Sequence, residues 1–167
     1  MTRGDRIRKW LVYGILLVLL TILNYDVLAA LSLPAIPLLL PVAAVAAGVL
    51  EGPVFGAGFS LAAGLLMYAA GGSAALVAVV PAIGLACGLL AQFVLRRDFW
   101  GFVPALLCTM LLWELYEVLS RLIGGGAAAG VLLSVAGAEY LWTAAFAAPV
   151  YFLCRFCCIH YGRIYYE

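Results

Sequence analysis

Long apolar runs separated by short breaks dominate this chain, and the breaks and ends hold most of the charged residues. The apolar runs cover about residues 10–31, 34–50, 54–70, 74–95, 102–123 and 135–158. A helix needs roughly 20 apolar residues to cross the hydrocarbon core of a bilayer. The pattern therefore predicts an all-α integral membrane protein, a compact bundle of six transmembrane helices.

The second and third runs are the shortest. Pro34, Pro37 and Pro41 mark the start of the second run, and Glu51-Gly52-Pro53 forms a tight turn between the two. The sequence leaves open whether these two helices cross the membrane fully or form a short hairpin.

Composition supports a membrane protein. The chain has 167 residues, of which 68% are hydrophobic and 10% charged, whereas a soluble domain averages about 45–50% apolar and about 25% charged residues. We expect one transmembrane domain at 10–158, between a basic segment at 1–9 and an interfacial tail at 159–167. No basic tract is interleaved with aromatic residues, so nucleic acid is not an expected partner.

The basic start followed by an apolar run also fits a signal peptide, but the run is long and lacks an A-x-A site, which favours an uncleaved first span. The distribution of basic residues then predicts the orientation. With a cytoplasmic N-terminus, the inner ends of the spans carry every basic residue except Arg121: Arg3, Arg6, Arg8, Lys9, Arg96, Arg97, Arg155 and Arg163. Both termini are expected in the cytoplasm.

The run at 102–123 is apolar yet carries Glu114, Glu117 and Arg121 on one helical face, and we expect the other helices to be arranged around it. The Glu117–Arg121 spacing of four residues suits an ion pair. Together with Asp26 and Glu139, these residues predict a polar layer in the outer half of the membrane. This layer is either a structural network that fixes the helix register or a site that binds a partner helix or a small solute.

Glycines recur at intervals of four residues in the middle of the chain. Such spacing lets helix backbones approach closely, so we interpret these glycines as packing or partner-contact surfaces: Gly48, Gly52, Gly56, Gly64, Gly84 and Gly88.

Candidate chemistry is sparse. Cys154, Cys157 and Cys158 precede His160 in a C-x-x-C pattern, but zinc sites usually draw on two separated pairs and no second pair is present. We interpret these cysteines as ordinary residues of a helix end. The sequence predicts no catalytic, cofactor-binding or metal-binding residue, and therefore no enzyme.

Three stretches resemble the bacterial rod shape-determining MreD family. They are the glycine-rich residues 52–66 (GPVFGAGF…GLL), the aromatic–glutamate segment 112–117 (LWELYE) and the closing stretch 147–155 (AAPVY…R). Their order and spacing, together with the size and the six short-looped spans, extend the resemblance over roughly residues 7–156. The resemblance implies a non-enzymatic multi-pass subunit of the bacterial inner membrane. Its partners would be the cell-wall elongation proteins MreC, MreB and RodA, with the penicillin-binding transpeptidase that works beside RodA.

Two alternatives remain open. Substrate-binding (S) components of energy-coupling-factor vitamin transporters have a similar six-helix architecture, and the acidic layer would then line a pocket open to the outside. A small intramembrane enzyme acting on lipid is the other alternative, for which the sequence offers no nucleophile or metal triad.

Overall fold

The computed structural model describes residues 3–31, 35–123 and 129–161, and helix is the only regular secondary structure within these ranges. The elements are α1 (Arg3–Ile22), a π-helical turn η1 (Leu23–Val27), α2 (Leu28–Ala30), α3 (Leu39–Glu51), α4 (Pro53–Ala69), α5 (Leu76–Phe93), α6 (Phe99–Ile123) and α7 (Ala129–Tyr161). Four stretches are long and apolar enough to cross a membrane: Ile7–Ala30, Leu76–Phe93, Phe99–Ile123 and Gly130–His160. The chain thus has the features of an all-α multi-pass membrane protein.

The second and third predicted spans are shorter than a crossing requires. With 13 residues in α3 and 17 in α4, a rise of about 1.5 Å per residue gives lengths of roughly 20 and 26 Å. The hydrocarbon core is about 30 Å thick. The two helices for which the sequence left a full crossing open, α3 and α4, are thus the shortest of the six apolar helices, and neither is among the four stretches long and apolar enough to cross a membrane.

Several helix limits differ from those expected. The first helix begins at Arg3, within the segment predicted as a separate basic N-terminus, and α7 begins at Ala129 rather than near residue 135. The helix expected from residue 34 is α3, which starts only at Leu39; Pro37 disfavours helical geometry in the residue before it. Residues 124–128 of the break between the last two apolar runs, and most of the predicted tail at 159–167, lie outside the described residues.

The central element is α3, which contacts α1, α4, α5, α6 and α7. Every residue from Leu39 to Val49 is buried. These residues are small or aliphatic on all sides, and a helix that is apolar all round is one that other helices can surround. The expectation that the charged helix at 102–123 would be central was therefore wrong: α6 lies at the periphery, with exposed leucines along its length.

Two polar side chains cap the buried start of α3. The Leu39 amide donates to Asn24 Oδ1 at 3.2 Å, and the Leu38 amide donates to Thr143 Oγ1 at 3.0 Å. The first amides of a helix have no partner within it, and away from water each must be satisfied by another group. The π-helical turn that carries Asn24 thus ties α1 to α3, and Thr143 ties α7 to it.

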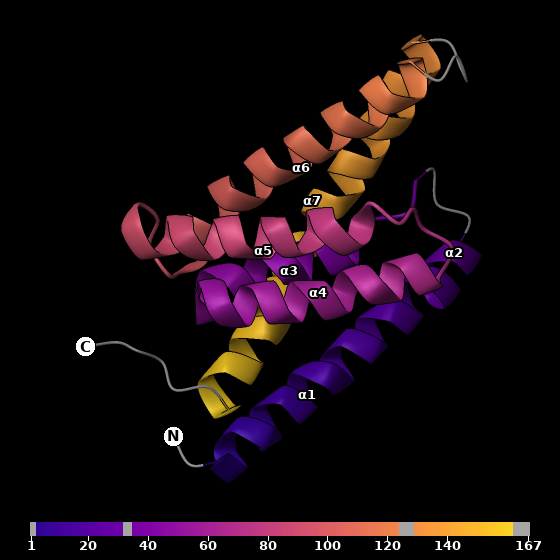
Figure 1. Cartoon of the computed structure of the whole chain (residues 1–167). Coiled ribbons are helices and arrows are strands. Elements are labelled where there is room, and N and C mark those ends of the chain that lie inside the picture. The colour runs from indigo at the N-terminus through magenta and orange to yellow at the C-terminus, as the bar shows by residue number, and fades with distance from the viewer. Residues whose placement is uncertain (1–2, 32–34, 124–128, 162–167) are drawn as a thin grey trace.

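Glycines bring α3, α4 and α5 into backbone contact, and these helices form the middle layer in Figure 1. A Cβ on Gly48 would lie 2.5 Å from the Gly84 carbonyl oxygen, and one on Gly56 would lie 2.6 Å from the Gly48 Cα. Gly64 and Gly88 similarly face the backbones of Leu76 and Pro53.

Gly52 has a different role from Gly48 and Gly56, the glycines four residues before and after it. Its φ is +90° and its ψ is 178°, while a Cβ there would meet nothing within 4 Å. Glycine is needed at this position for the turn between α3 and α4 and not for helix packing, because this backbone region is almost restricted to glycine.

The remaining helices surround this layer. The start of α1 and the end of α7 lie at the same end of the molecule (Figure 1). The C-terminal end of α6 and the N-terminal end of α7 extend together beyond the α3–α4–α5 layer. With 33 residues, α7 is roughly 50 Å long at a rise of about 1.5 Å per residue.

Candidate functional site: an acidic pocket between α6 and α7

Four of the five residues of the expected polar layer line one pocket between α6 and α7. The cavity has a volume of about 230 Å³, and its lining consists of Glu114, Glu117, Val118, Arg121, Val131, Leu132, Val135, Ala136 and Glu139. Three carboxylates and one guanidinium thus meet in a pocket whose remaining walls are aliphatic.

Glu114 is the most deeply buried acid of this pocket. Its relative exposure is 9%, and its Oε1 atom is buried without a hydrogen-bond partner among the described residues. A buried ionised carboxylate is strongly unfavourable unless another group compensates its charge. Glu114 therefore either carries a proton or is paired with a group from outside the described residues.

Glu117 and Arg121 form the ion pair that their spacing predicts. The Arg121 Nη2 atom donates to Glu117 Oε2 at 2.6 Å. The side chains are 60% exposed for Arg121 and 37% for Glu117, so the pair lies at the surface of the protein. Pairs of this kind contribute only about 0.2–0.5 kcal/mol to helix stability.

A double-mutant cycle measures this pair. We expect Arg121→Ala and Glu117→Ala each to lower the melting temperature in detergent slightly. Because each removes the same contact, the double variant should lose less than the sum of the two, by about 0.5 kcal/mol or less. Full additivity would show that the two side chains do not interact.

Asp26 does not belong to this pocket, contrary to the expectation from sequence. It lies in the π-helical turn η1 with an exposed side chain, whereas the pocket is built by α6 and α7 alone. The π-helical turn shifts the helical phase at this point, and it is the neighbouring Asn24 that faces inward, onto α3.

A second buried polar group, joining α1, α3 and α7, was not predicted. The Lys9 ammonium pairs with Glu51 Oε2, with side-chain exposures of only 10% and 5%. The Tyr13 hydroxyl lies 2.9 Å from Glu51 Oε1 and 3.4 Å from the Cys154 carbonyl oxygen. The Phe55 ring of α4 covers the ammonium, with its centroid 4.4 Å from Nζ. Charged groups this deeply buried are rare unless they are paired.

Two sequence signals could have revealed this group. Lys9 and Tyr13 are four residues apart, which places them on one face of α1. Glu51 is a lone acid between two apolar runs and has no basic residue near it in sequence. The three cysteines of the closing helix, Cys154, Cys157 and Cys158, are buried free thiols beside this group.

Comparisons with models of known families, with curated proteins and with solved structures found no match to this chain.

Proposed function

We propose that this chain is a non-enzymatic subunit of the bacterial cytoplasmic membrane that organises the cell-wall elongation machinery through helix–helix contacts. This is the role implied by its resemblance to the MreD family, and MreC, MreB, RodA and the associated penicillin-binding transpeptidase would be its partners. Both termini would face the cytoplasm, as the basic residues suggest.

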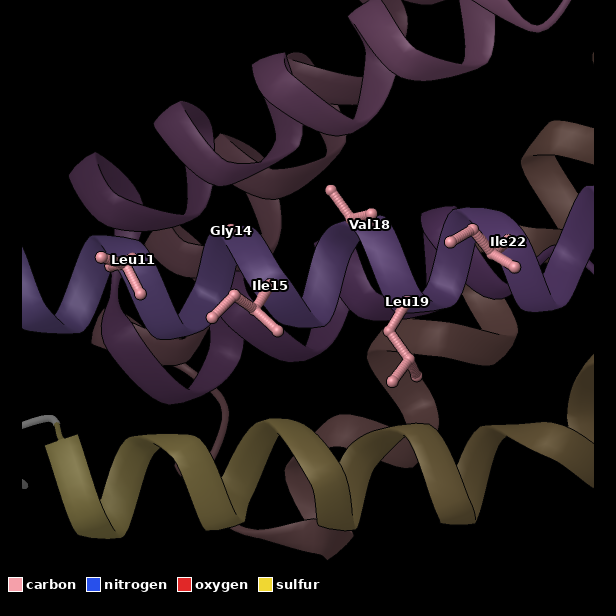
Figure 2. Close-up of a pocket in the computed structure, with 6 residues that line it drawn as sticks. All are labelled: Leu11, Gly14, Ile15, Val18, Leu19 and Ile22. Carbon is pink, nitrogen blue, oxygen red and sulfur yellow. The ribbon is translucent and has the colours of Figure 1, made fainter.

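The observation that carries the proposal is an apolar seam left open along α1. Leu11, Ile15, Val18 and Ile22 follow a 4-3-4 spacing, which is the repeat by which helices pack against one another. With Gly14 and Leu19, they line a hollow of about 590 Å³. Figure 2 shows this row along α1, with Val18 above the helix and Leu19 below it in this view.

The interior of the protein supports the same role. The glycine contacts and the buried Lys9–Glu51 pair hold the helices in fixed positions, so the open seam is presented by a rigid body. A preorganised surface binds a partner with less loss of conformational entropy than a mobile one.

The test is affinity purification from native membranes in mild detergent, with the recovered proteins identified by mass spectrometry. We expect MreC and the wall-synthesis enzymes with the wild-type chain. A Leu11→Ala/Val18→Ala variant should lose them, because it removes two side chains of the seam. A matched Leu133→Ala/Leu141→Ala variant, which shortens exposed leucines of α7, should retain them.

An S component of a vitamin transporter is the second candidate, and the acidic pocket between α6 and α7 is the observation that favours it. Recovery of a transmembrane coupling protein with paired ATPases in the same experiment would replace the scaffold proposal with this one.

A further inference from the structure

Within the described part of the chain, α6 and α7 alone line the acidic pocket, and apolar side chains around it are exposed. The outer parts of α6 and α7 extend beyond the middle layer (Figure 1), and leucines and valines around the pocket are exposed. These exposed residues include Leu111, Leu115, Val131 and Val135. A further helix in the membrane would have room to pack beside α6 and α7 at this level.

The charges of the pocket are not balanced within the described part of the chain. Arg121 is paired with Glu117, and no ion pair of Glu114 or Glu139 occurs among the described residues. The neighbouring residues 124–128 read GGGAA and carry no charge. Among the described residues, Glu114 and Glu139 therefore lack a cation of their own, and a basic group from another molecule could pair with them.

The walls indicate what kind of cation fits. Glu114 and Glu139 approach from two helices, so that their oxygens can accept several hydrogen bonds from one guanidinium group. Val118, Leu132, Val135 and Ala136 supply an apolar surface of the kind that the methylene stem of a long basic side chain covers.

We propose that this pocket receives a basic side chain, arginine above all, from a transmembrane helix of a partner protein. The proposal rests on the proposed function in that a partner supplies the helix. Glu114 lies nine residues before the end of α6, roughly 14 Å along the helix axis. The basic residue of the partner is therefore expected at a similar depth below the outer end of its own helix.

The experiment uses the full chain reconstituted in lipid vesicles and a synthetic leucine-rich transmembrane peptide. One peptide carries a single arginine at that depth, and the matched peptide carries glutamine there. Association is measured by energy transfer between labels on the peptide and the protein. We expect the arginine peptide to bind roughly three- to tenfold more tightly, the range of polar contacts between membrane helices.

Protein variants locate the effect. Glu114→Gln and Glu139→Gln should each reduce the preference for arginine, and each tests the site if the other variant fails to fold. Asp26→Asn, which changes an exposed acid outside the pocket, should leave the preference unchanged. Equal binding of the two peptides to the wild-type protein would overturn the proposal, as would a preference that persists in both glutamine variants.

Methylguanidinium distinguishes a free solute from a side chain of a partner. Suppose that this small cation raises the melting temperature of the wild-type protein but not of Glu114→Gln, while the two peptides bind equally. The pocket is then a solute site and the proposal is wrong. The outcome is also separable from that of the proposed function. Suppose that the arginine peptide is preferred but no cell-wall proteins are recovered from native membranes. This result would support the arginine-binding pocket and reject the proposed role in the elongation complex.

Discussion

Lys9→Met is expected to destabilise the folded protein by about 3–5 kcal/mol, the range seen when one partner of a buried ion pair is removed. The Glu51 side chain is only 5% exposed, so without the ammonium its charge would be left in an apolar environment. Tyr13 would still contact Glu51 Oε1, but a single neutral hydroxyl does not replace a positive charge. Methionine is unbranched and matches the lysine side chain as far as Cε, so the variant removes the ammonium with little change in packing.

The measurement is an unfolding titration with SDS in mixed micelles. Arg96→Met is the matched control, because its side chain is 83% exposed and we expect it to shift the transition by less than about 0.5 kcal/mol. The double variant Lys9→Met/Glu51→Met should recover most of the loss, since neither charge remains buried. Equal effects of Lys9→Met and Arg96→Met would show that the Lys9–Glu51 pair does not stabilise the fold.

This pair also shows why the basic start of the chain is more than an orientation signal. Basic residues before a first span are normally interpreted by the positive-inside rule, which treats them as exposed charges. Here Lys9 is buried and joins α1 to α3, while Tyr13 joins α1 to both α3 and α7. Hydropathy alone could not reveal this, because the partner of Lys9 is 42 residues away in sequence.

Hydropathy was sufficient to predict the helices themselves. Each of the six apolar runs contains a helical stretch, because a backbone in lipid must satisfy its hydrogen bonds internally. It was not sufficient to predict which helix is central. Lipid-facing and protein-facing side chains are both apolar in a membrane, so the periodicity that distinguishes them in water is lost.

Residue size carried the missing information. The stretch from Leu39 to Val49 consists mainly of alanine, valine and glycine, whereas the periphery of α6 is rich in leucine. Small residues allow neighbouring helices to approach closely on several sides, which is what α3 requires. The charges of 102–123 drew attention to α6, but they line a pocket at the edge of the protein and not its centre.

Gly56→Ala tests this small-residue core directly, and we expect a loss of roughly 2–3 kcal/mol. An added Cβ would lie 2.6 Å from the Gly48 Cα of α3 and 2.9 Å from the Gly84 carbonyl oxygen of α5. Both neighbours are backbone atoms, so no side chain can rotate away and the helices must separate. The intrinsic preference of alanine for helix favours the variant by about 1 kcal/mol, but the clash with two helices is the larger effect.

Two other glycines provide matched controls in the same SDS titration. At Gly14 a Cβ would meet nothing within 4 Å, so Gly14→Ala should stabilise the protein by about 0.5–1 kcal/mol through helix preference alone. At Gly58 the nearest atoms belong to the Trp10 ring, which can move, so its effect should be small. The signs for Gly56→Ala and Gly14→Ala are therefore opposite. If both variants were stabilising, α3, α4 and α5 could separate freely, and the rigid body on which the open α1 seam depends would not exist.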